Sequence, residues 1–447
     1  MKRYIFSLLL LSAFLTASAQ RVMTLQECID SALTHNRALA NAAIDIESAS
    51  LQQKEAYTKY FPQIQASALA FQAFDKIIRG DGTIPAQIAA VIPALASYAG
   101  QKYSIREFSR AYNITLSAME PIYAGGRIHT ANDLAAVQRE VSQLQYRLKE
   151  KDLRQKITEN YWKVASIKYD LNTVAAAEKQ VDEMYRQVEL FVNTGVSTRN
   201  DLLRVSLRRH ELQSTRLQLE NGQKVLLLLL AQQIGMAGQE IDIVADTAAV
   251  TPPQSVYASP ILSVENREEL HLARQSVRAD SLQARMERGK LLPTVSVGLV
   301  GYNIGLGGFS RAENDILKTN LTNGMVAATV SVPISDWWGG SRAVRRKKLA
   351  LRQAKNDVID ARERLQVDIS SAYSDLEVAY KQIDIARASV EQAEENLRIT
   401  SLQYKAGIEN LTNLLDAETL NRQAHNSLST ALASYHSAFT TYMLKTR

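Results

Sequence analysis

Pro121-Ile122-Tyr123-Ala124-Gly125-Gly126 has a second, altered copy in the same chain, Pro333-Ile334-Ser335-Asp336-Trp337-Trp338-Gly339-Gly340. Each copy opens more than a hundred residues that contain no proline. The spacing of 212 residues between the two prolines recurs downstream between Gly195 and Gly407. A spacing that persists over this distance indicates an internal duplication, and it predicts one elongated body built from two repeats rather than a row of separate domains.

The proline-free stretches are predicted to form very long helices, because proline interrupts helix interiors and glycine is also absent between Gly126 and Gly195 and between Gly340 and Gly407. The second stretch repeats every seven residues as a coiled-coil seam with a large and a small side: Leu376, Ile383, Val390, Leu397 and Tyr404, with Ala379, Ala386, Ala393 and Thr400. The first stretch has a looser form of this pattern at Val174, Val181 and Val188.

Each long helix is expected to end at its glycine and to turn into a second helix that runs back. These returning helices are expected from Asp201 to about Ile234 and from Asn413 to about Lys445. Each repeat therefore contributes one helical hairpin.

Four segments near the prolines change to a period of two, which predicts strands. Apolar residues occupy alternate positions in the clearest three: Tyr112, Ile114, Leu116 and Ala118; Val295, Val297 and Leu299; Val326, Ala328, Val330 and Val332. Strands of about ten residues with one apolar face suit a bilayer-spanning sheet. Four strands cannot close a barrel, so the open edges are expected to pair with further copies of the chain.

These patterns predict an α+β membrane protein with a defined order of segments. We expect a signal peptide (1–19), shorter helices (20–61 and 264–292), strand pairs with extracellular loops (62–121 and 293–333), long helical hairpins (122–235 and 334–447) and a linker between the repeats (236–263).

The N-terminus predicts export from the cytoplasm. Lys2 and Arg3 precede an apolar run that ends in Ala17-Ser18-Ala19, which is the pattern of a signal peptide cleaved after Ala19. Loss of these two cations lowers the formal charge from +6 to +4, too weak a bias to indicate a nucleic acid partner. The single cysteine, Cys28, is expected to pack as a small apolar residue in the first helix.

Nothing in the sequence indicates a catalytic, metal-binding or phosphate-binding site. The six histidines are scattered over different predicted elements, and His210-Glu211 lacks the second histidine of a zinc-protease helix. The glycines from Gly298 to Gly308 lack the Lys-Ser/Thr of a phosphate-binding loop and are expected in an extracellular loop. We therefore predict no catalytic residue, no metal, no cofactor and no enzymatic activity.

The doubled order of strand pair, long helical hairpin and tip glycine resembles the TolC family of outer-membrane efflux channels. The local marks are Thr24-Leu25-Gln26-Glu27-Cys28, the two Pro-Ile…Gly-Gly stretches and the Leu-Leu that follows each tip glycine. The resemblance covers nearly all of the mature chain. It implies a homotrimer whose strands form a twelve-stranded barrel in the outer membrane and whose helices continue it as a tunnel into the periplasm. It also implies a periplasmic adaptor protein and an inner-membrane pump as partners.

The resemblance further implies a gate at the periplasmic end of the tunnel. Carried over by position, the gate residues are Tyr404, Asp201 and Asp416, with Asn413 where the family has an Asp. Glu409 stands where the best-known pattern has an Arg, so the closing link either rests on Tyr404 and Asp201 alone or recruits Arg199 or Arg204. The adaptor is expected to dock on the tips: Thr194, Gly195, Val196, Ala406, Gly407 and Ile408.

Three further features are expected near the membrane. Tyr123, Trp337 and Trp338 follow strands and either form an interfacial aromatic girdle or pack a sheet end. A run of cations either meets anionic lipid head groups of the inner leaflet or is a solvated first helical turn: Arg342, Arg345, Arg346, Lys347, Lys348 and Arg352. The loop from Asp75 to Arg110 holds a 19-residue insertion of the first repeat and is expected to be partly helical.

Three functions remain open from the sequence. The first is an outer-membrane exit duct that passively conducts substrates from pump and adaptor. The second is the corresponding exit of a type I protein-secretion machine, which the sequence does not separate from drug or metal efflux. The third, of a different class, is a coiled-coil surface protein without a pore, which would not explain the four alternating strands.

Overall fold

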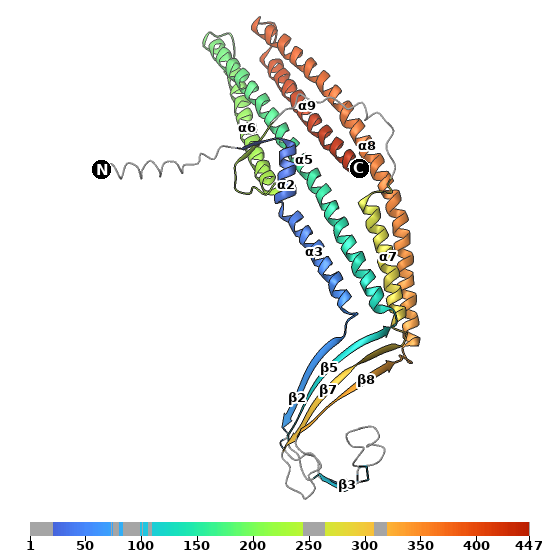
Figure 1. The fold of residues 1–447 in the computed structure, drawn as a ribbon. Helices are drawn as coiled ribbons and strands as arrows, with labels where there is room; N and C mark the ends of the chain where they lie inside the picture. Colours follow the sequence, from blue (N-terminus) through green and yellow to red (C-terminus); the bar gives the residue numbers. More distant parts are fainter. Residues whose placement is uncertain are drawn as a thin grey trace, which may run out of the picture. The chain divides into compact units, whose positions relative to one another are not determined.

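The computed structural model describes residues 21–72, 74, 80–83, 99–100, 102–105, 110–244, 264–307 and 320–446. Each repeat places a pair of strands before a long helical hairpin (Figure 1). The first repeat contains α2 (Leu25–His35), α3 (Arg37–Thr58), β2 (Gln63–Gln72), β5 (Arg110–Ala124), α5 (Arg127–Asn193) and α6 (Arg199–Gln233). The second contains α7 (Glu268–Gly289), β7 (Thr294–Gly307), β8 (Asn320–Ser331), α8 (Trp337–Lys405) and α9 (Leu411–Thr446). The expected class of long coiled-coil helices with antiparallel strands is confirmed.

The described residues fall into two compact units. One contains 49–139 and 276–354, which include the strands and the helix ends next to them. The other contains the described residues before Ala49 together with 140–275 and 355–446, which include both hairpin tips.

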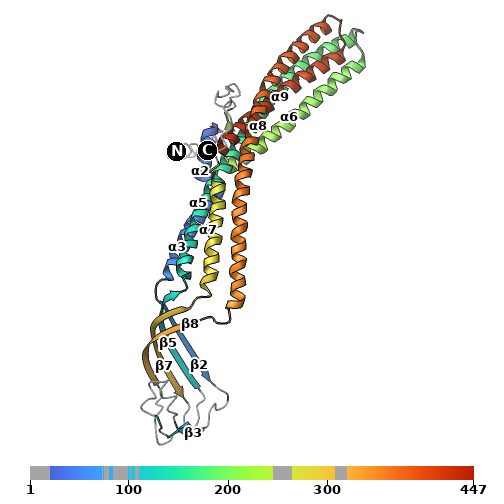
Figure 2. The same cartoon turned by 90° about the vertical axis from the view of Figure 1, so that its right-hand side faces the viewer.

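The four long strands form one antiparallel sheet in the order β2-β5-β7-β8 (Figure 2). Its register puts Ala66 opposite Leu116, Leu116 opposite Gly301, and Gly301 opposite Gly324. The central residues on this face are apolar or small, and the larger apolar ones are exposed, with Ile64 74% and Val326 74% accessible. Among the described residues, β2 pairs with β5 alone and β8 with β7 alone, so both outer edges of the sheet are open.

One expectation for the sheet was wrong. Gly298, Gly301, Gly305 and Gly307 lie inside β7 and not in an extracellular loop. At two of these positions, Gly298 and Gly305, residues of β5 occupy the space that a side chain would need. A Cβ at Gly305 would lie 2.1 Å from the ring of Tyr112, and one at Gly298 would lie 2.5 Å from the sulfur of Met119. The glycines therefore accommodate cross-strand packing within the sheet.

Three buried clusters hold the helical unit together. Cys28 is fully buried in the first, with Ile157 and Leu230, and burial raises the pKa of its thiol to about 11. This cluster also contains a short parallel pair that the sequence analysis did not predict, β1 (Arg21–Met23) with β6 (Ile241–Ile243). The second cluster joins α7, α8 and α9, and the third joins the hairpin tips.

The heptad seams lie where the sequence predicts them. Leu376, Ile383 and Leu397 of α8 are buried, and so are Val174, Val181 and Val188 of α5. The long helices contain 67 and 69 residues and end at Asn193 and Lys405, two residues before the tip glycines.

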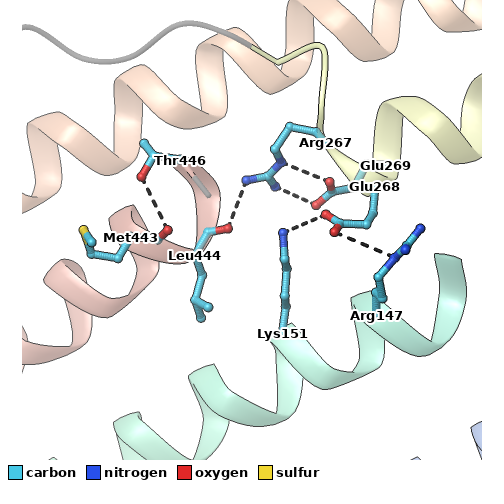
Figure 3. Close-up of polar contacts among 8 residues, drawn as sticks. All are labelled: Arg147, Lys151, Arg267, Glu268, Glu269, Met443, Leu444 and Thr446. Atoms are coloured by element: carbon cyan, nitrogen blue, oxygen red, sulfur yellow. Dashed lines mark hydrogen bonds and ion pairs between the residues drawn. The ribbon is translucent and has the colours of Figure 1, made fainter.

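A polar cluster connects the start of α7 to α5 and to the C-terminal end of α9 (Figure 3). Arg267 is buried and donates to the Leu444 carbonyl oxygen at 3.2 Å and to Glu269 at 2.6 Å. The neighbouring Glu268 accepts from Lys151 at 2.6 Å. The cation caps carbonyl groups at a helix C-terminus and the carboxylates lie at a helix N-terminus, so both arrangements suit the helix dipoles.

Several expectations lie wholly or partly outside the described residues, namely the signal peptide (1–19), most of the 75–110 loop and most of the linker (236–263). In the described part of the loop, β3 (Gly80–Thr83) pairs with β4 (Lys102–Ile105) as two antiparallel strands. Among the described residues, no helix combines the length and apolar character of a membrane span.

Candidate functional site at the hairpin tips

Both hairpins turn through the same backbone motif. Gly195 has φ +77° and Gly407 has φ +73°, in the left-handed region that favours glycine. The amide of Val196 donates to the Phe191 carbonyl at 2.8 Å, and the amide of Ile408 donates to the Gln403 carbonyl at 2.9 Å. These bonds span five residues and satisfy the last carbonyl groups of α5 and α8, as in a Schellman motif.

The tips expose apolar side chains outside a tightly packed bundle. Val196 is 74% and Ile408 77% accessible. Immediately behind them, all four helix ends meet in the third buried cluster, which joins the two hairpins of one chain: Val181, Met184, Val188, Val205, Leu212, Leu397, Tyr404, Leu411, Leu414 and Ala417. The tips are therefore apolar ends on a firm four-helix base.

Asp201 is the third residue of α6 and completes a capping box with the N-cap residue Thr198. Its carboxylate accepts from the Thr198 hydroxyl at 2.7 Å, from the Ser197 hydroxyl at 3.0 Å and from the Thr198 amide at 3.2 Å, while its own amide donates to the Thr198 hydroxyl. This capping box lowers the pKa of Asp201, chiefly through the Thr198 hydroxyl, with a smaller contribution from Arg204. Asp201 is therefore charged at neutral pH.

Tyr404 lies in the core of the tip bundle and close to Asp201. Its side chain is 9% accessible, and its ring lies 6.5 Å from the ring of Phe191 across the hairpins. Burial raises the pKa of Tyr404, and the nearby charge of Asp201 raises it further. The structure thus brings together two of the residues predicted for the gate, one from each hairpin of the same chain.

The remaining predicted residues divide into two groups. Arg204 joins the hairpins, because its guanidinium donates to the Thr412 hydroxyl at 2.6 Å. The side chain of Arg199 is exposed and forms no hydrogen bond or ion pair with the described residues. Glu409 is engaged within its own turn, where its carboxylate accepts from the Asn413 side-chain amide at 2.6 Å and from the Asn410 amide at 3.0 Å.

Asn413 and Asp416 lie on the exposed side of α9, away from the tip bundle. Leu420 continues this face with 53% accessibility, at the spacing of one side of a helix. Asp416 is therefore placed to face a space outside its own chain.

An ion pair that was not predicted from the sequence lies behind the tips. Arg208 of α6 contacts Glu418 of α9 at 2.8 Å through Nε and at 2.5 Å through Nη2, and it also donates to Thr419 at 2.8 Å. Glu418 is 1% accessible. A signal was present, because Arg208 falls between Val205 and Leu212 in a heptad seam, where an apolar residue is expected.

The aromatic residues predicted for the membrane interface lie at the other compact unit. Tyr123 ends β5 and is 45% accessible, and Trp338 follows β8 and is 84% accessible. The side chain of Trp337 lies outside the described residues. No group of three metal-binding side chains occurs in the part of the chain that the structure describes.

Comparison with known proteins gives a family match over part of the chain and a fold match over most of it. Residues 261–442 match the family model described as outer membrane efflux protein. None of the curated proteins compared with the sequence matches it. The fold matches VceC from Vibrio cholerae (TM-score 0.72, 14% identity, covering 94% of this chain and 95% of VceC) and the Campylobacter jejuni CmeC channel (0.72, 15%, 94% and 85%). It also matches the open state of Neisseria gonorrhoeae MtrE (0.69, 17%, 94% and 88%).

Proposed function

We propose that the chain is the exit duct of a tripartite efflux system, because residues 261–442 match the outer membrane efflux protein family. It is an outer-membrane channel that extends into the periplasm, and it performs no enzymatic reaction. Substrates would pass from an inner-membrane pump and a periplasmic adaptor through this duct, with energy supplied by the partners.

The observation that carries the proposal is the open four-stranded sheet with an exposed apolar face. Its edges at β2 and β8 have no strand partner among the described residues. Open edges are costly in lipid, so three copies would join β8 of one chain to β2 of the next and close a twelve-stranded barrel. The helical hairpins of the three copies would then continue the barrel as a tunnel.

The gate and the docking surface are proposed at the tips. Closure would rest on the position of Tyr404 near the charge of Asp201 and on the hydrogen bond from Arg204 to Thr412, repeated in each copy. Asp416 would line the passage next to the gate, with Asn413 one turn before it. The adaptor would bind the exposed apolar residues Val196 and Ile408.

The test is the mass and conductance of the full-length protein purified from outer membranes in a neutral detergent. Native mass measurement is expected to give three chains, and planar bilayers are expected to show channels. A water-soluble protein that needs no detergent would favour the coiled-coil surface protein, and a stable single chain in detergent would contradict the barrel.

A photo-crosslinker placed at Val196 or Ile408 tests the docking surface in cells. It is expected to capture an adaptor protein, whereas a crosslinker at Leu217, an exposed residue on the shaft of α6, is the control. The pump that accompanies this adaptor then separates drug or metal efflux from type I protein secretion.

A further inference from the structure

The first part of α8 is strongly cationic, and neither the proposed gate nor the docking surface involves it. Residues 341–353 contain six Lys or Arg and no Asp or Glu, whereas residues 129–141, 212 positions earlier in α5, contain one Arg and two acids. Both segments form helices of similar length. The cations are therefore not needed to build the helix, and at a helix N-terminus they oppose the dipole.

The cations are free and point away from the rest of their unit. Arg342, Arg345, Arg346 and Lys348 are exposed, and none has an ion-pair partner among the described residues. Lys347 alone turns toward α7, where it donates to Gln283 at 2.7 Å. At 3.6 residues per turn, Arg342 and Arg345 lie opposite Lys347 on the helix, and Arg346 and Lys348 lie on either side. The four free cations therefore share one broad face.

This face begins close to the end of the sheet where β8 leads into α8. Exposed apolar and aromatic residues precede it, with Ile334 75% and Trp338 84% accessible. The strands that meet at this end bring further exposed residues, Phe61 before β2 and Tyr123 at the end of β5. A band of exposed aromatic residues followed by cations is the pattern of a membrane–water interface.

The distance of each cation from the start of α8 determines whether it can reach the lipid headgroups. From the first residue of α8, Arg342 is about 8 Å and Lys348 about 16 Å away at 1.5 Å per residue, whereas Arg352 is about 22 Å away. A headgroup layer is about 5–8 Å thick, and Lys and Arg side chains extend toward it. The first four free cations are within reach of the headgroups, and Arg352 lies beyond them.

We propose that Arg342, Arg345, Arg346 and Lys348 form a binding surface for anionic phospholipids of the periplasmic leaflet of the outer membrane. The proposal rests on the outer-membrane location and not on the gate or on the docking tips. Phosphate groups supply the complementary charge, and the exposed apolar residues that precede the cations hold the helix start at the leaflet.

The test is titration of the full-length protein in neutral detergent with short-chain phosphatidylglycerol and, separately, with short-chain phosphatidylcholine. The variant carries Arg342→Gln, Arg345→Gln, Arg346→Gln and Lys348→Gln. Its affinity for phosphatidylglycerol is expected to fall at least about ten-fold, because each surface cation contributes several-fold to anionic-lipid binding. The parent protein is expected to bind phosphatidylglycerol more tightly than phosphatidylcholine. Added salt is expected to weaken its binding of phosphatidylglycerol.

Two control variants keep the test sharp. A variant with Lys at the three Arg positions retains the charge and is expected to retain binding. A variant with Lys179→Gln, Arg186→Gln, Lys224→Gln and Arg387→Gln removes four exposed cations from the hairpins and is expected to bind like the parent.

Unchanged affinity in the first variant, or an equal loss in the hairpin variant, would overturn the proposal. Dissociation of the first variant into single chains would also overturn it, because the cations would then contact a neighbouring copy. Channel conductance of the same variant separates this proposal from the proposed duct, since a variant that conducts without binding the lipid leaves the duct intact.

Discussion

At the scale of single residues, Asp201 has two interactions, and only one of them follows from the local sequence. It caps α6 through Thr198 and it lies close to Tyr404 on the other hairpin. The capping task follows from local sequence, because Thr198 precedes Asp201 by three residues. The proximity to Tyr404 depends on how the two hairpins pack, which only the structure gives.

The gate is expected to loosen when the interaction of Tyr404 with the charge of Asp201 is weakened. Tyr404→Phe combined with Asp201→Asn removes the hydroxyl and the charge, while asparagine retains an oxygen for the cap. A single polar interaction contributes only about 1 kcal/mol, so closure depends on interactions repeated in every copy. Single-channel conductance in planar bilayers should therefore rise well above that of the parent.

Asp416→Asn serves as the comparison, because it removes a charge from the exposed face without touching the contact between the hairpins. It should alter cation preference more than the open fraction. Unchanged conductance in the double variant would show that other links, foremost Arg204 with Thr412, hold the gate.

Asp170 is expected to make stability depend on pH. It is partly buried between α5 and α9, where Ser429 donates to it at 2.6 Å, and burial raises its pKa from 3.8 to about 6. The cost of burying its charge is fully present above pH 6 and disappears as the pH falls toward 4. Asp170→Asn should therefore melt roughly 2–4 °C above the parent at pH 7.5, and this difference should vanish near pH 4.

The difference between the two melting curves cancels the opposite contribution of His436, whose pKa burial lowers to about 4. Asp152→Asn is the control on the same helix, since its side chain is 59% accessible. A difference for Asp170→Asn that does not change with pH would refute the assignment.

At the scale of elements, the two hairpins of one chain are joined by a buried ion pair behind the tips. Arg208→Met leaves the Glu418 carboxylate buried without its cation, which costs about 3–5 kcal/mol. The double variant with Glu418→Met should regain most of this loss. The melting midpoint of the helical circular dichroism signal checks both.

Arg216, whose side chain is 51% accessible and forms ion pairs with Glu220 and Glu178, supplies the comparison. Replacement of Arg216 there should cost only about 0–1 kcal/mol. If the double variant at Arg208 and Glu418 melts as low as the single one, the loss comes from packing and not from the unpaired charge.

The tip turns are expected to be required for export and not for assembly. Gly195→Leu and Gly407→Leu place a side chain at a left-handed position, at a cost of about 1–2 kcal/mol, and cover the turn that the adaptor would contact. Substrate export should be lost while outer-membrane insertion and the oligomer persist. Gly238→Leu is the matched control, because Gly238 has φ +85° and open space around it but lies away from the tips.

Export that survives both tip substitutions would show that the adaptor docks elsewhere. Loss of export in the Gly238 variant as well would show that backbone strain, and not the covered turn, causes the effect.

At the scale of the whole molecule, the sequence predicts the repeated helices and strands, but it does not predict contacts between residues that are far apart in the chain. Proline and glycine spacing, together with the heptads around Leu376 and Val181, reveals the long helices and the strands. The parallel pair of β1 with β6 and the pairing of Arg208 with Glu418 join residues more than two hundred positions apart. No local period marks such contacts.

The glycines of β7 show why local reading fails there. Glycine normally indicates a loop, but here the ring of Tyr112, from a strand of the other repeat, lies against Gly305. A packing partner that is remote in sequence reverses the usual meaning of the residue. The open sheet edges are a further consequence of long-range pairing, and they lead to the last prediction.

The proposed barrel requires β8 of one copy to pair with β2 of the next, and cysteine pairs at the two open edges test this directly. In a chain with Cys28→Ala, Ala68→Cys on β2 is combined in turn with Gly324→Cys, Val326→Cys or Ala328→Cys on β8. Edges that stay unpaired in lipid would be unstable, so at least one combination should lie in register with the neighbouring copy. Oxidation in membranes should then give covalent dimers and trimers on a denaturing gel. The matched control is Leu116→Cys with Gly301→Cys, which are direct partners within one chain and should give no ladder. Single chains in all three edge combinations would mean that the sheet closes in another way.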